Sequence, residues 1–133
     1  MMNTRIVMSL SAILLGTSGM ALTFAPDVVA RALTSEDNRT TELILQIMGA
    51  LYFAFAMLNW MSKGNLIGGI YNRPIAIANF THFLIAGLAL AKWWKVNTTT
   101  SSVISIATIF YIVLAILFGV MMFTHPIKEN PNA

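Results

Sequence analysis

Four polar side chains lie inside long apolar stretches of this sequence, where they could do chemistry or hold helices together. Gln46 and Asn59 interrupt one stretch, and Asn79 and His82 interrupt the next. Each is costly to place in hydrocarbon unless it faces other protein groups. Histidine is also the side chain whose charge changes most readily near neutral pH. These four residues are therefore the first candidates for a functional site.

Two interpretations of these residues remain open. In the first, they hydrogen-bond across helices, and each such bond contributes roughly 0.6–2 kcal/mol to stability in a bilayer. In the second, they line a small polar pocket in which His82 carries a proton, hydrogen-bonds a ligand or binds a metal. Tyr52 and Tyr111 could border that pocket, because hydroxyl groups well inside apolar stretches need partners. The predicted ligand-binding residues are Gln46, Tyr52, Asn59, Asn79 and His82.

Missing residue types narrow the chemistry further. The chain has no cysteine, which excludes disulfides, thiolate nucleophiles and Cys-ligated zinc. Its five acidic residues all lie outside the apolar stretches, so no carboxylate there can carry a proton. This separates the chain from the small multidrug resistance transporters, which need a membrane-embedded glutamate in their first helix. A single histidine without Cys or carboxylate neighbours is no metal site by itself, so we predict no catalytic residues and no metal site, and we assign no cofactor.

The composition indicates which elements must position these groups. Of 133 residues, 57% are hydrophobic and 10% are charged, and the mean hydropathy is +0.74. Four apolar runs, each about as long as a bilayer is thick, cover residues 6–25, 43–62, 74–94 and 103–124. Helices are expected for them because an open sheet edge cannot face lipid. Residues 27–33 place Asp27 and Arg31 opposite an apolar helical face, which predicts a short interfacial helix. The predicted fold is all-α, a single-domain integral membrane four-helix bundle.

Helical spacing places the polar residues on two faces. Gln46 and Asn59 share one face of the second predicted span, and Asn79 and His82 share one face of the third. An antiparallel hairpin through the loop at residues 62–73 would bring Asn59 and Asn79 to similar depth. His82 would then lie one turn deeper. We therefore expect the two faces to meet.

Small residues predict where helices approach one another closely. Gly16 could support a homodimer as well as packing within the chain. The residues predicted to pack helices together are Ala12, Gly16, Gly19, Gly49, Ala115 and Gly119.

Charge gives a weak indication of orientation and partners. The eight Lys and Arg residues divide four and four between the two sides of the predicted spans, while four of the five acidic residues lie on the side opposite the N-terminus. We expect both termini in the cytoplasm. The net charge of +3 fits contact with anionic lipid, and because the basic residues form no patch, we predict no nucleic-acid partner. The expected partners are the lipid bilayer and either further copies of this chain or another membrane protein.

Several motifs together resemble a known family. They are FAPD at residues 24–27, Glu42 leading to GALY at residues 49–52, and NRP at residues 72–74 leading to Asn79 and His82. In this arrangement the chain resembles the DoxX-like group of small bacterial four-helix membrane proteins. The resemblance implies a bacterial inner-membrane location and, for some relatives, a link to quinone or thiol redox systems. The absence of cysteine argues against the thiol link here.

Three functions fit these observations. The leading prediction is a non-catalytic, multi-pass membrane component that binds a lipophilic ligand or a partner helix at the polar residues of the second and third spans. The enzyme alternative is a quinone-linked or lipid-modifying membrane oxidoreductase subunit, in which His82 exchanges a proton with a ligand. The third is a small transporter or channel assembled from several copies, since one four-helix chain is thin for an enclosed aqueous path.

Overall fold

The computed structural model describes residues 4–33, 38–64, 73–96 and 102–123, and no strand occurs among them. The chain divides into two compact units, Met1–Gly64 and Asn65–Ala133. Four long helices are apolar enough to cross a membrane: α1 (Thr4–Phe24), α3 (Arg39–Ser62), α4 (Arg73–Val96) and α5 (Ser102–Phe123). The all-α membrane fold is thereby confirmed, and the chain is a multi-pass membrane protein.

The helix ends follow from local chemistry. The second predicted span begins four residues earlier than expected, at Arg39, because the Asn38 side chain accepts a hydrogen bond of 2.9 Å from the Thr40 backbone N–H. At the other end of α3, the Lys63 Nζ lies 2.9 Å from the centroid of the Trp60 ring, a cation–π contact. The expected last residue of the fourth span, residue 124, and the connection at residues 65–72 lie outside the described residues.

A short helix, α2 (Pro26–Leu33), follows the first span as predicted. Only Ala25 separates it from α1, and backbone hydrogen bonds from Ala25 to Ala21 and from Val29 to Ala25 continue through the junction. Proline suits the first position of a helix, since it has no N–H to leave unsatisfied there. The Asp27 carboxylate and the Arg31 guanidinium form an exposed ion pair of 2.6 Å.

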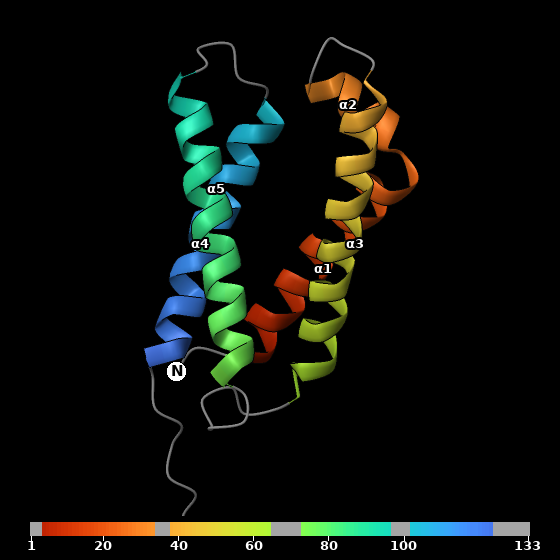
Figure 1. Cartoon of the computed structure of the whole chain (residues 1–133). Coiled ribbons are helices and arrows are strands. Elements are labelled where there is room, and N and C mark those ends of the chain that lie inside the picture. The colour runs from red at the N-terminus through yellow and green to blue at the C-terminus, as the bar shows by residue number, and fades with distance from the viewer. Residues whose placement is uncertain (1–3, 34–37, 65–72, 97–101, 124–133) are drawn as a thin grey trace, which may run out of the picture. The chain divides into compact units, whose positions relative to one another are not determined.

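In the N-terminal unit, α1 and α3 pack as an antiparallel pair and α2 covers one end of it (Figure 1). A Cβ added to Gly19 would lie 2.9 Å from the Gly49 carbonyl oxygen, and one added to Gly49 would lie 2.5 Å from the Thr23 Oγ1. The two backbones therefore approach too closely for side chains at these positions. Gly16 is less tightly placed, since its added Cβ would lie 3.5 Å from that of Ala56.

In the C-terminal unit, α4 and α5 also pack as an antiparallel pair (Figure 1), but aromatic rings fill the seam between them. Phe83 is fully buried and makes an edge contact with Tyr111, with ring centroids 5.3 Å apart. It also stacks on Phe118 at 5.6 Å. Such pairs contribute stability beyond the area they bury. The side chains, rather than the backbones, hold this pair together.

Candidate functional site

Asn59 is fully buried in the pair formed by α1 and α3. Its Nδ2 donates a hydrogen bond of 3.0 Å to the Oγ of Ser11, which is also fully buried. The Ser11 hydroxyl in turn donates to the Met8 carbonyl oxygen at 2.9 Å. Sequence reasoning did not name Ser11, although its spacing of four residues from Leu15 and eight from Gly19 places it on the buried face of α1.

Asn79 and His82 lie one turn apart on α4. The Asn79 Nδ2 donates to the Ile75 carbonyl oxygen of the same helix at 2.9 Å. The half-buried His82 ring contacts Phe83 at 5.1 Å and, across the seam, Tyr111 at 5.8 Å between centroids. Tyr111 therefore borders His82, as the sequence suggested it could. Asn79 is fully buried and Tyr111 is buried as well, so on this flank of the C-terminal unit only the imidazole of His82 is partly exposed.

The remaining two predicted site residues lie on α3 in different surroundings. Gln46 is exposed, whereas Tyr52 is half-buried and packs against a small apolar cluster that includes Leu22, Ala30 and Leu45. Gln46, Tyr52 and Asn59 thus belong to the N-terminal unit, and the other two predicted residues belong to the C-terminal unit. Contact between the two polar faces stays a prediction.

Within residues 4–33, 38–64, 73–96 and 102–123, no three His, Asp or Glu side chains come together as a metal-binding group. His82 therefore gains no metal-binding partners from the part of the chain that the structure describes.

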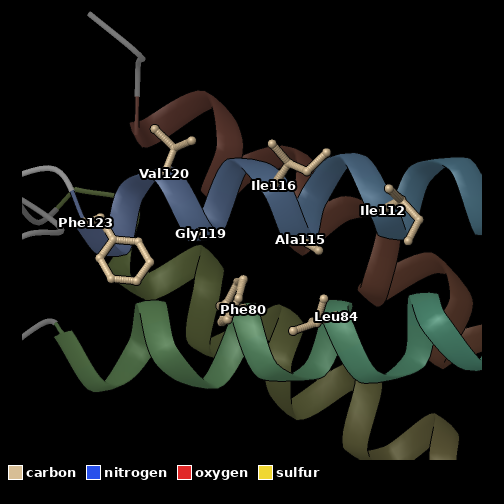
Figure 2. A pocket seen from close by; sticks show the side chains of 8 residues that line it. All are labelled: Phe80, Leu84, Ile112, Ala115, Ile116, Gly119, Val120 and Phe123. Carbon is tan, nitrogen blue, oxygen red and sulfur yellow. The ribbon is translucent and has the colours of Figure 1, made fainter.

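A groove runs along the outside of the pair formed by α4 and α5, and sequence reasoning missed it. Its volume is about 470 Å³, within the range of about 300–1,000 Å³ common for small-molecule sites. Figure 2 shows Phe80 and Leu84 extending from α4 toward α5. Every residue that lines the groove is apolar: Phe80, Leu84, Ile112, Ala115, Ile116, Gly119, Val120 and Phe123.

Gly119 shapes the groove by lacking a side chain. A Cβ at this position would lie 3.1 Å from Cε2 of the Phe80 ring, so the ring occupies the space that a larger residue would fill. Glycine spacing in the sequence indicated close packing here. It could not indicate a hollow, because the hollow depends on which rings from the opposite helix fill the remaining space.

The groove and the polar flank lie on opposite sides of α4. At about 100° per residue, Phe80 and Leu84 project to one side of the buried Phe83, and Asn79 and His82 project to the other. His82 is accordingly absent from the groove lining. The unit thus has an apolar groove on one side of α4 and the half-buried His82 ring on the other.

Comparisons with known protein families, with curated proteins and with solved structures found no match to this chain.

Proposed function

We propose that this protein is a non-catalytic, multi-pass membrane component that binds a lipophilic ligand in the groove between α4 and α5. The observation that carries the proposal is the groove itself, which has a volume of about 470 Å³ and only apolar residues in its lining. A polar or charged molecule would lose its hydration there without gaining hydrogen bonds. A hydrocarbon chain has no hydrogen bonds to lose and would gain contacts with the groove walls.

Shape is what distinguishes this groove from an ordinary lipid-facing surface. Inside a bilayer, hydrocarbon gains no hydrophobic free energy by moving from lipid to an equally apolar protein surface, so association depends on packing. Phe80 and Phe123 provide flat ring surfaces, and Gly119 lets the Phe80 ring lie close against α5. A chain held against rings on two helices makes more contacts than one lying on a smooth helix face.

Native mass spectrometry of protein extracted gently from its membrane tests this proposal. We expect a bound lipophilic molecule on the wild-type chain and its loss from Val120→Trp, which places an indole in the groove. Val113→Trp is the matched control, because Val113 and Val120 are both 46% exposed on α5 but only Val120 lines the groove. The control should keep the ligand. A bare wild-type chain, or equal loss from both variants, would reject the proposal.

The polar flank favours a second candidate function, a quinone-linked oxidoreductase subunit. The observation is that His82 lies against Tyr111, with ring centroids 5.8 Å apart. The half-buried imidazole is a suitable hydrogen-bonding group for a quinone carbonyl, and the buried Tyr111 ring positions it. In the same extraction, a quinone that is retained by the wild type and by Val120→Trp but lost from His82→Ala would favour this function over the first.

We further propose a bacterial inner-membrane location, with both termini in the cytoplasm. The location follows from the resemblance to the DoxX-like group, and the orientation from the distribution of charged residues.

Because the chain has no cysteine, single cysteines can be labelled without background. Thr40 and Gly64 lie at opposite ends of α3, and both are exposed. In intact cells, Thr40→Cys should react with a membrane-impermeant thiol reagent and Gly64→Cys should not. The reverse pattern would invert the topology.

A further inference from the structure

The groove has a cationic residue beyond one of its ends. Arg73 is the first residue of α4 and is exposed. It precedes Phe80 by seven residues, which places it on the same helical face and about 10 Å further along the axis. On α5, Gly119 contacts Phe80, and Phe123 lies one turn beyond Gly119 toward the Arg73 end. The groove therefore runs toward Arg73.

Charge at this end of the unit is unopposed within the two helices. Neither α4 nor α5 contains an acidic residue. The other basic residues of α4, Lys92 and Lys95, lie in its last turns at the opposite end. The start of a helix also carries a partial positive charge, which adds to that of the guanidinium. An anionic group at the membrane surface would thus be attracted to the Arg73 end of the groove.

From the apolar groove together with this charge, we infer that the ligand is an anionic phospholipid. Its acyl chain lies in the groove, and its phosphate is bound by Arg73. This inference rests on the proposed function. Acyl chains are common to all membrane lipids, so the groove alone cannot select among them. The guanidinium supplies the selection, because it matches phosphate geometry and attracts net negative charge at the membrane surface.

Competition between two lipids with identical acyl chains tests the inference. The full-length protein is reconstituted in nanodiscs with equal amounts of phosphatidylglycerol and phosphatidylethanolamine, and the lipids retained after gentle extraction are counted by native mass spectrometry. The wild type should retain about fivefold more of the anionic lipid, the ratio expected for one cation near the surface. Arg73→Gln should abolish that preference while still retaining lipid.

Two variants control for charge. Arg73→Lys keeps the cation and should keep most of the preference, although it loses the bidentate geometry. Lys95→Gln removes the same charge from the other end of α4 and should leave the ratio unchanged. Equal loss in Lys95→Gln and Arg73→Gln, or a wild type without preference, would overturn the inference.

A measurement on the wild type alone keeps the test decisive if Arg73→Gln does not fold. Raising the salt concentration should reduce the anionic preference, because screening weakens attraction between exposed charges. A preference unaffected by salt would contradict the inference.

Val120→Trp separates the two proposals. If this variant retains lipid as the wild type does, the groove is not the binding site and the proposed function fails first. If it loses lipid but the wild type shows no head-group preference, only the role of Arg73 fails.

Discussion

The two helix pairs of this protein are both built from long apolar helices but pack by different means. Between α1 and α3, glycine lets the backbones come together, and a buried hydrogen bond joins Asn59 to Ser11. Between α4 and α5, the rings of Phe83, Tyr111 and Phe118 fill the seam. The groove lies beside the second seam, where the shapes of rings determine the packing.

The largest effect should come from adding one methyl group to the close backbone contact. Gly49→Ala would place a Cβ 2.5 Å from the Thr23 Oγ1 and 2.9 Å from the Gly19 carbonyl oxygen. Overpacking of this kind costs about 1–3 kcal/mol, which exceeds the roughly 1 kcal/mol that alanine contributes to helix stability relative to glycine. We expect a lower melting temperature in detergent.

Gly16→Ala is the matched control on the same pair of helices. Its Cβ would meet that of Ala56 at 3.5 Å, an ordinary contact, so the gain in helix propensity should dominate. Stability should be unchanged or higher. Equal destabilisation by Gly16→Ala and Gly49→Ala would show that the backbones do not approach most closely at Gly49.

The hydrogen bond between Asn59 and Ser11 should have the next largest effect. A double-mutant cycle of Asn59→Ala, Ser11→Ala and the combined variant should give a coupling free energy of about 0.6–1.7 kcal/mol, the range for such bonds between membrane helices. Unfolding in a denaturing detergent, followed by circular dichroism, measures it. A coupling near zero would mean that the bond contributes nothing beyond the separate burial of the two side chains.

Sequence reasoning was successful where a single helix carries the information. Polar or proline-containing segments bound the apolar runs, so the four long helices and the short α2 were predicted, with the largest error at the start of α3. Partner choice is harder to predict. Asn59 donates to Ser11, which sequence reasoning did not name, and the expected meeting of the Asn59 and Asn79 faces stays a prediction.

The groove could not be predicted from sequence, because it arises from side-chain shapes on two helices. Phe80 and Gly119 are 39 positions apart in the chain, and neither residue alone indicates a hollow. Periodicity reports which face of a helix is apolar. It does not report whether apolar side chains from facing helices fill the space between them.

Gly119→Ala should have the smallest effect on stability. It also gives the sharpest comparison within the pair formed by α4 and α5. The added Cβ would lie 3.1 Å from the Phe80 ring edge, and a ring can shift by a few tenths of an ångström. The gain in helix propensity of up to about 1 kcal/mol then roughly offsets the crowding, so the melting temperature should hardly change.

Gly87→Ala has the same 3.1 Å clearance, against the end of the Ile112 side chain, and should have a similarly small effect on the melting temperature. Ligand retention should fall more in Gly119→Ala, because Gly119 itself lines the groove, whereas Gly87→Ala reaches the groove only through the end of the Ile112 side chain. If native mass spectrometry finds equal retention in both, the space beside Gly119 is not where the ligand is held.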